Sequence, residues 1–350
     1  MLAWLEKPIK IIDQQMIDDA KEHQMSLTKP PGALGQLEDV AIRMAAIQGN
    51  NEPECDYIKT IVFASDHGVV AENISAFPQI VTVEMIKNFS HGGAAINVLC
   101  DYIESDLQVI NVGTVTEMDP LPTVLDQRVG AGTANFCQQP AMTEKQLDDA
   151  LNVGRLSVQS LFLNPLDLFI GGEMGIGNTT SAAAIICAIL NEPATNIAGK
   201  GTGLEAAAVK HKCDVIEQAL LKHRDSMKSP LDVLRCLGGF EIAALTGAYI
   251  SCAQQGIPML IDGFICSAAA LIATELYPDS LEWMFFSHTS AEKGHQLLMQ
   301  RMSVTPLLSL GLRLGEGSGA ATAVPLIRMA CKLHGQMATF DSANVSNQTD

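Results

Sequence analysis

A lone glutamate between two glycines is the residue whose surroundings point most directly to acid–base chemistry. Glu316 stands between Gly315 and Gly317, with Leu312 and Leu314 before it and an Ala-rich helical pattern after it. Apolar neighbours raise the pKa of a carboxyl group toward the range of a general base, and flanking glycines let a substrate approach the carboxylate. The alternative interpretation is an ordinary solvated glutamate in a loop that precedes a helix.

A second glycine-rich loop has the composition of an anion-binding site. The segment Gly171–Thr180 follows the apolar run Leu168–Ile170 and leads into the Ala-rich helical pattern Ser181–Leu190. The free N–H groups and the dipole of a helix N-terminus favour an anion, and glycines let that anion come close. The loop matches neither GxGxxG nor GxxxxGK[ST], so a tight turn with a helix cap is the alternative to a phosphate site.

Two further residues are candidates for contact with the same anion. Ser290 follows the apolar run Met284–Phe286 and either caps the next helix or contacts a phosphate. Lys212 lies beside the apolar stripe of the helical pattern Leu204–His223, which follows the glycine-rich Gly199–Gly203, and no acidic residue stands three or four positions away. It is either an anion ligand or a surface lysine with a partly buried stem.

The sequence gives little support to a metal site. Asp66 and His67 follow the apolar run Thr60–Ser65 and are a candidate metal or acid–base pair, but the other histidines show neither HxH nor HxxxH spacing. No Gly-x-Ser-x-Gly elbow is present. Transferases that use a diphosphorylated ribose with Mg²⁺ typically carry two adjacent acidic residues after a strand, whereas Asp18-Asp19 and Asp148-Asp149 lie in helical patterns. We therefore expect no metal and no other cofactor.

Charge and composition exclude several classes of protein. The 350 residues include 22 Lys and Arg against 39 Asp and Glu, a net charge of −17 that disfavours nucleic acid and anionic membrane surfaces as partners. A hydrophobic fraction of 47% is too high for a disordered chain. The nine cysteines contain no CxxC motif, which predicts reduced thiols in a cytoplasmic protein.

Neither a leader nor a membrane span is expected. Met1–Lys10 carries charges and has no apolar stretch of useful length, so it does not resemble a signal peptide. The uncharged stretch Ile242–Ile261 contains Gly256 and Pro258, and a buried helix followed by a short strand explains it better than a membrane span.

Apolar runs that alternate with helical patterns predict an α/β fold with a doubly wound, mostly parallel, Rossmann-like sheet. Ligands of such sheets bind beyond the carboxyl ends of the strands. The runs are Thr60–Ser65, Leu107–Val112, Leu168–Ile170, Pro258–Ile261 and Met284–Phe286, and the helical patterns are Val81–Cys100, Thr143–Leu161, Asn178–Leu190, Leu204–His223 and Leu231–Gln254.

The two ends of the chain predict a smaller helical domain. Ile11–His23 and Gln36–Gln48 read as amphipathic helices around the turn Lys29–Gly32, and Gly319–His334 is a long helical pattern. We expect residues 1–50 and about 320–340 to form this domain and residues 51–320 to form a large α/β catalytic domain. The polar residues 341–350 are expected to be a frayed tail.

Taken together, these motifs resemble the nicotinate-nucleotide–dimethylbenzimidazole phosphoribosyltransferase family, which acts in the assembly of the cobalamin nucleotide loop. The matches occur in the family's order from about residue 28 to 330. They are Lys29–Glu38, Asp66–Val69, Gly92–Ala95, Gly172–Thr180, Gly238–Glu241, Asp262–Phe264, Ser287–Glu292 and Arg313–Gly319.

The resemblance implies transfer of the 5-phosphoribosyl group from nicotinate mononucleotide to 5,6-dimethylbenzimidazole or a related base. The products would be α-ribazole 5′-phosphate and nicotinate, with inversion at the anomeric carbon. The ring nitrogen of the nicotinate group is cationic in the donor, and the ring leaves as a neutral pyridine. The resemblance therefore implies that no metal is required. The alternatives are a metal-dependent hydrolase or phosphotransferase that uses Asp66 and His67, and a nucleotide sensor without catalysis.

The resemblance also implies roles for particular residues. Glu316 matches the general base, and Glu173 matches an auxiliary carboxylate near the donor. A homodimer with its site near the interface is implied as well. Donor and phosphate contacts are expected from Gly175, Gly177, Asn178, Thr179, Lys212 and Ser290, and the pocket for the acceptor base from Phe77, Pro78, Glu84, Met85 and Leu314.

Overall fold

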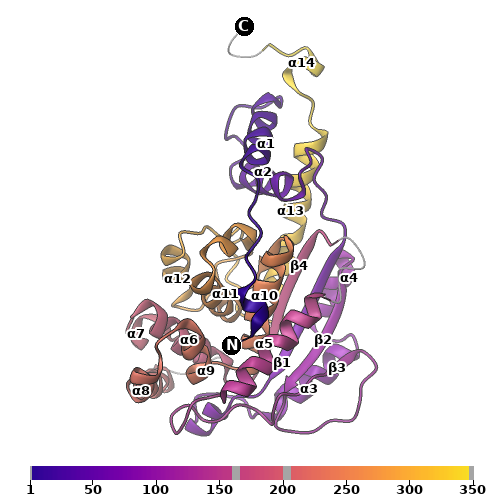
Figure 1. Ribbon diagram of the computed structural model, residues 1–350. Coiled ribbons are helices and arrows are strands. Elements are labelled where there is room, and N and C mark those ends of the chain that lie inside the picture. The colour runs from indigo at the N-terminus through magenta and orange to yellow at the C-terminus, as the bar shows by residue number, and fades with distance from the viewer. Residues whose placement is uncertain (1, 160–165, 200–205, 347–350) are drawn as a thin grey trace.

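The computed structural model describes residues 2–159, 166–199 and 206–346, and it contains a six-stranded sheet in which all neighbouring strands are parallel (Figure 1). The strand order is β3-β2-β1-β4-β5-β6. The first three strands are therefore added toward one edge of the sheet and the last three toward the other edge, with the switch point between β1 and β4. This confirms the predicted doubly wound parallel sheet. The strands are β1 (Ile58–Ser65), β2 (Asp106–Gly113), β3 (Val124–Asp126), β4 (Leu168–Met174), β5 (Met259–Ile261) and β6 (Met284–Phe286).

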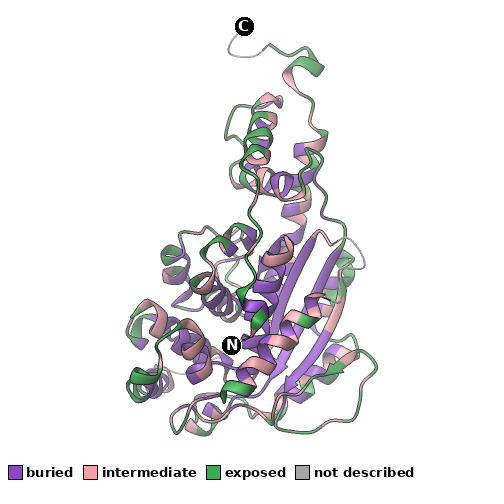
Figure 2. Cartoon of the chain, in the orientation of Figure 1, coloured by how far each residue is buried: buried purple, intermediate pink, exposed green. Residues whose placement is uncertain are grey.

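The central strands are mostly apolar and are buried on both faces, because helices cover both faces of the sheet (Figure 2). All residues of β1 are buried, and β4 pairs with it in a register that places Val62 opposite Gly172 and Phe63 opposite Glu173. The side chains that follow β1 and β4 therefore meet at the switch point of the sheet, where α/β folds bind ligands.

Helices form a layer on each side of the sheet. On one face, α3 (Ile80–Ser90), α4 (Ala95–Ile103) and α13 (Ser318–Gln336) contact β1, β2 and β4. On the other face, α10 and α11 contact the strands, and the helices around them complete the layer. This second group comprises α5 (Glu144–Gln159), α6 (Asn178–Leu190), α7 (Ala194–Ile197), α8 (Ala206–His223), α9 (Pro230–Leu237), α10 (Phe240–Gln255), α11 (Phe264–Leu276) and α12 (His295–Arg301).

Two helices predicted as continuous are each divided at a pair of glycines. The pattern Val81–Cys100 forms α3 and α4, separated by a turn in which Gly92 has φ +77°. The pattern Leu231–Gln254 forms α9 and α10, separated by Gly238 and Gly239. The predicted ends at 160–161 and 204–205 lie outside the described residues.

The helices of the two termini pack against one another. Helix α1 (Gln14–Ser26) contacts α2 (Gln36–Gln48), and α2 contacts α13; the three stand above the sheet in Figure 1. The amide of Gln24 lies 2.7 Å from Nδ1 of His334, which ties the first of these helices to the last. Residues 340–343 form the short helix α14 (Phe340–Ala343), and 347–350 lie outside the described residues, so the expected frayed tail stays a prediction.

The uncharged stretch that ends near Ile261 forms the buried helix α10 and strand β5. Within the described ranges, no helix has the length and apolarity needed to cross a membrane. All nine cysteines are unpaired thiols, and eight of them are buried in the core, Cys137 being partly exposed.

Candidate active site

A cavity of about 90 Å³ lies beyond the carboxyl ends of β4, β5 and β6. It is the place where the sheet topology predicts a ligand. Six of the residues proposed from the sequence line it, and four acidic, basic or histidine residues not proposed there join them. The former are Glu173, Gly175, Asn178, Thr179, Ser290 and Leu314, and the latter are Asp262, His288, Glu292 and Arg313.

The glycine loop places the N-terminus of α6 at this cavity. Gly177 is the N-cap residue with φ +96°, and no side chain caps the helix. The loop also touches helix α3, since the backbone N–H of Ile176 donates to Oγ1 of Thr82 over 3.2 Å. A helix start that lacks a side-chain cap and lies at a cavity favours the anion-binding interpretation over a simple capped turn.

Lys212 reaches the first turn of α6 from helix α8. Its Nζ donates to Oγ1 of Thr179 over 2.9 Å, and only 1% of the residue is exposed, which excludes a surface lysine. Burial lowers the pKa of Lys212 to about 8, while the charge of Glu292 opposes that shift. Below that pH, Lys212 presents a cation beside the predicted phosphate site.

Ser290 is held by the backbone and by a neutral histidine. Its N–H donates to Nδ1 of His295 over 2.8 Å, and its Oγ accepts from the N–H of Glu292 over 3.3 Å. Burial lowers the pKa of His295 to about 3, so the ring remains an acceptor for Ser290 at neutral pH. The next helix, α12, begins only at His295, so Ser290 does not cap it.

Glu173 is a buried carboxyl group at the end of β4. Its Oε2 accepts a hydrogen bond from Nδ2 of Asn178, the first residue of α6. Burial raises the pKa of Glu173 well above its ordinary value, and the charges of Asp262, Glu241 and Glu316 raise it further. This carboxyl group therefore takes up a proton much more readily than an exposed glutamate.

Glu316 is buried as well, with 5% of its surface exposed, which excludes the solvated-loop alternative. Its N–H donates to the carbonyl of Glu173 over 3.2 Å, and its Oε2 accepts from the N–H of Ile96, in the first turn of α4, over 3.4 Å. Burial raises the pKa of Glu316, the charge of Asp262 adds to this shift, and the bond from Ile96 opposes it. A carboxylate with a raised pKa beside a cavity has the properties of a general base.

The residues proposed for the acceptor pocket do not all meet at this cavity. Of the five, Leu314 lines it, and Leu314 is 60% exposed. Phe77 and Pro78 precede α3 and are exposed, Glu84 is exposed on α3, and Met85 packs against the core cluster that contains Ile96. Their assignment to the acceptor pocket therefore stays a prediction.

The sequence contains a signal for two of the additional cavity residues. Asp262 follows β5 directly, and His288 stands two residues after β6, so both obey the rule that ligands bind beyond the strand ends. Nδ1 of His288 lies 3.8 Å from Oδ1 of Asp262. Arg313 and Glu292 lie in loops whose course no local sequence pattern reveals.

Asp66 and His67 serve a different purpose from a metal site. Nε2 of His67 lies 2.7 Å from Oε1 of Glu241, and Nδ1 lies 2.9 Å from Oγ of Ser181, so both ring nitrogens already have partners. Among the described residues, no group of three or more His, Cys, Asp or Glu side chains has a metal-binding arrangement. His67 instead supports the glycine loop, because Gly175 packs against its ring, and Asp66 accepts from the N–H of Val115.

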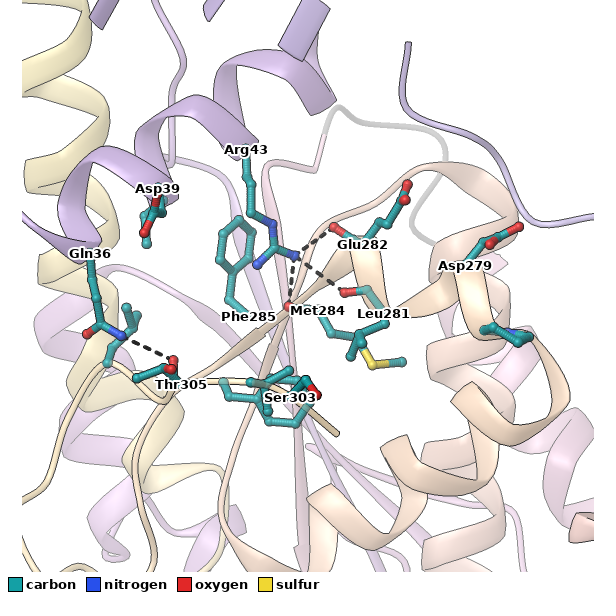
Figure 3. Close-up of a pocket in the computed structure, with 15 residues that line it drawn as sticks. Gln36, Asp39, Arg43, Asp279, Leu281, Glu282, Met284, Phe285, Ser303 and Thr305 are labelled. Carbon is teal, nitrogen blue, oxygen red and sulfur yellow. Dashed lines mark hydrogen bonds between the residues drawn. The ribbon is translucent and has the colours of Figure 1, made fainter. Parts of the chain in front are cut away.

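A larger cavity of about 750 Å³ lies elsewhere, between α2, β6 and residues 278–282 and 303–307 (Figure 3). Arg43 of α2 reaches across it, stacks on the ring of Phe285 at 4.2 Å and donates to the carbonyls of Glu282 and Met284 over 2.7 and 2.9 Å. None of the proposed site residues lines this cavity. Arg43, the cationic side chain of this cavity, therefore attaches the terminal helix α2 to the region of strand β6.

Comparisons with known proteins agree with the fold and with the family that the sequence motifs resemble. The sequence profile of a family described as phosphoribosyltransferase matches residues 9–345, which defines the class of the chain. Two proteins named nicotinate-nucleotide–dimethylbenzimidazole phosphoribosyltransferase, from Pseudomonas putida (strain W619) and Pseudomonas fluorescens (strain SBW25), are 53% and 54% identical over 346 residues, or 99% of each chain. The chain belongs to the nicotinate-nucleotide–dimethylbenzimidazole phosphoribosyltransferase family.

A solved structure supports the same assignment. The crystal structure of CobT from Thermus thermophilus superimposes with a TM-score of 0.91 at 41% sequence identity, and the match covers 95% of this chain and 99% of that one. The fold of nearly the whole chain is therefore similar to that of this protein.

Proposed function

We propose that the protein transfers the 5-phosphoribosyl group of nicotinate mononucleotide to 5,6-dimethylbenzimidazole or a related base. The products are α-ribazole 5′-phosphate and nicotinate, formed with inversion at the anomeric carbon for assembly of the cobalamin lower ligand. The observation that carries the proposal is the buried Glu316, hydrogen-bonded through its backbone to Glu173 at the edge of a phosphate loop. The names of the relatives support the donor and acceptor.

The donor is expected to bind with its phosphate at the start of α6. Asn178 and Thr179 form the first turn of that helix, Gly175 and Gly177 allow close approach, and Lys212 and Ser290 lie at its edge. Glu173 then lies near the ribose as an auxiliary carboxylate. This arrangement supplies local donors that overcome the repulsion of a chain with net charge −17.

The reaction needs one base and one leaving group. A ring nitrogen of the acceptor forms a bond to C1′ of the ribose from the face opposite nicotinate, and the bond from C1′ to the nicotinate nitrogen breaks. Its electron pair stays on that nitrogen, which becomes a neutral pyridine. The N–H at the other ring nitrogen of the acceptor then becomes acidic, and Glu316 accepts this proton. We place the acceptor near Phe77, Pro78, Glu84, Met85 and Leu314.

Three broader properties belong to the same proposal. We assign residues 1–50 and about 320–340 to a small helical domain and 51–320 to the catalytic domain, which the contacts among α1, α2 and α13 support. We also propose a homodimer with the site near its interface, and a cytoplasmic location. The reduced state of all nine cysteines is compatible with that compartment.

The alternatives receive less support. A metal-dependent hydrolase built on Asp66 and His67 would need a free ring nitrogen, but Ser181 and Glu241 occupy both. A sensor without catalysis has no need for a buried carboxylate between two glycines beside the cavity.

Substitution of Glu316 tests the proposed chemistry. Glu316→Gln keeps the size and the acceptor oxygen for the Ile96 N–H but removes the base. We expect kcat to fall by at least about 10²-fold while the affinity for nicotinate mononucleotide, measured by titration calorimetry, stays within about twofold.

Glu275→Gln, at an exposed position of α11, is the matched control and should retain full activity. An unchanged kcat in Glu316→Gln would remove this residue from the mechanism. Loss of donor affinity together with kcat would instead indicate a binding role.

A further inference from the structure

The general base stands in a backbone conformation that side chains disfavour. Gly315, Glu316 and Gly317 have φ values of +91°, +64° and +84°, three consecutive left-handed residues. Glycine adopts such values freely, but glutamate does not. A non-glycine residue stays in this region only when its surroundings hold it there.

Asp262 supplies the contacts that hold this turn. Its Oδ2 accepts from the N–H of Gly317 over 3.2 Å, and its Oδ1 accepts from the N–H of Ala320 over 2.9 Å. Both donors belong to the start of α13, the helix that begins directly after the turn. Because Asp262 follows β5 and is only 2% exposed, it connects the turn to the sheet through a rigid strand end.

The backbone of this turn is tightly packed on both sides. A Cβ atom on Gly319 would lie 2.8 Å from Oδ1 of Asp262 and would overlap the ring of His288. On the other side, Gly172 of β4 packs directly against the backbone carbonyl of Glu316. The turn is thus enclosed between the ends of β4 and β5.

We propose that Asp262 is a positioning residue for the proton transfer, because its carboxylate fixes the left-handed turn and places a negative charge beside Glu316 and Glu173. The inference rests on the proposed function, since it takes Glu316 as the base. Asp262 lines the cavity, but its role in this inference is to act through the turn.

The charge of Asp262 gives the inference a pH-dependent consequence. The titratable and charged side chains that line this cavity are Glu173, Asp262, Cys266, His288, Glu292 and Arg313. Glu316 follows the lining residue Gly315, and the charge of Glu241 also acts on Glu173. The charge of Asp262 raises the pKa of both Glu316 and Glu173. Burial raises the pKa of Asp262 itself, whereas the charge of His288 and the bonds from Ala320 and Gly317 oppose that shift and favour the ionised form. Removal of this charge should therefore lower the pKa of Glu316.

Two substitutions separate the effect of the hydrogen bonds from Gly317 and Ala320 to Asp262 from the effect of its charge. Asp262→Asn keeps one acceptor oxygen and removes the charge, so kcat should fall several-fold, and the acid limb of its pH profile should move to lower pH. Asp262→Ala removes both acceptors, and kcat should fall by about 10²-fold, the size of effect expected from a misplaced catalytic group. The KM for nicotinate mononucleotide should change by less than about twofold in Asp262→Asn.

The controls are Asp279→Asn, at an exposed position before β6, and Glu316→Gln. A kcat of Asp262→Asn within about twofold of wild type, with an acid limb at the wild-type pH, would overturn the inference. If Asp262→Ala does not fold, the pH profile of Asp262→Asn decides the question, because a purely structural role does not move it. Undiminished turnover in Glu316→Gln would instead refute the proposed base, whatever the Asp262 variants show.

Discussion

Burial brings the pKa values of Glu316 and Lys212 closer together. It raises the pKa of Glu316 above its ordinary 4.5 and lowers that of Lys212 to about 8. The proposed reaction needs Glu316 ionised and Lys212 protonated at the same time. Activity should therefore rise with pH as Glu316 loses its proton and fall again as Lys212 loses its own.

The basic limb of this profile is a prediction about Lys212. The ratio kcat/KM for nicotinate mononucleotide should decrease as pH rises through about 8, because the free enzyme then loses the cation beside the phosphate site. In Lys212→Ala the KM for the donor should rise at least about tenfold, and this limb should disappear. Steady-state kinetics between about pH 6 and about pH 9.5 measure both effects.

Lys228→Ala, at an exposed position, is the control for removal of a positive charge. A donor KM for Lys212→Ala equal to that of the wild type would show that Lys212 does not contact the phosphate.

The sequence alone indicates those site residues that stand beside an unusual local motif, such as a cluster of glycines. The flanking glycines indicate Glu316, and the preceding glycine loop indicates Asn178. The partners that act on them come from distant segments: Asp262 is more than fifty positions from Glu316 along the chain, and Lys212 meets Thr179 only through the packing of α8 on α6. Local patterns carry no information about such contacts, so the clamp by Asp262 required the structure.

At the scale of elements, close helix packing depends on glycines within helices. Helix α5 lies against α10, and a Cβ atom on Gly154 would overlap the carbonyl oxygen of Ala244. In the same interface, a Cβ atom on Gly247 would overlap the carbonyl of Leu151. Two backbones approach here more closely than any larger residue allows.

Gly154→Ala should therefore destabilise the protein although alanine favours helix formation. The added methyl group forces α5 away from α10, and we expect the free energy of unfolding to fall by about 1–3 kcal/mol. Urea denaturation followed by circular dichroism measures it.

Gly335→Ala in α13 is the matched control, because its Cβ atom would lie 3.2 Å from Cα of Glu52, a tight contact at the surface rather than an overlap. Its free energy of unfolding should change by less than about 1 kcal/mol. Equal effects of the two substitutions would contradict the packing argument.

Element prediction fails where periodicity is weak. No helical pattern indicates α11, because nine of its thirteen residues are buried and it lacks the polar face that such a pattern needs. Strand β3 has only three residues and lies at the sheet edge. A glycine pair within a periodic stretch is compatible with one continuous helix, whereas here such pairs separate α3 from α4 and α9 from α10.

At the scale of the whole molecule, partly buried polar contacts join the terminal helices to the sheet and to the segments beside it. Arg43 connects α2 to β6, and Arg328 of α13 donates to the carbonyls of Cys55 and Ile103 over 2.9 and 2.7 Å. These bonds fix the terminal helices firmly on the catalytic layer. The amphipathic pattern of the termini predicts the helices, but not these attachments.

The proposed homodimer is a prediction at the same scale. Size-exclusion chromatography with light scattering should give twice the chain mass of 37.4 kDa at micromolar concentration. A mass of one chain at every concentration tested, together with full activity, would contradict a dimer whose site lies near the interface.

The dependence of nicotinate release on the acceptor tests the central claim most directly. The purified protein is incubated in EDTA with nicotinate mononucleotide, with and without 5,6-dimethylbenzimidazole, and both products are quantified by liquid chromatography. The account predicts nicotinate release only when the base is present, with an equal amount of α-ribazole 5′-phosphate. Release without the base would show a nucleosidase, and no release under either condition would show a binding protein; each result would contradict the account.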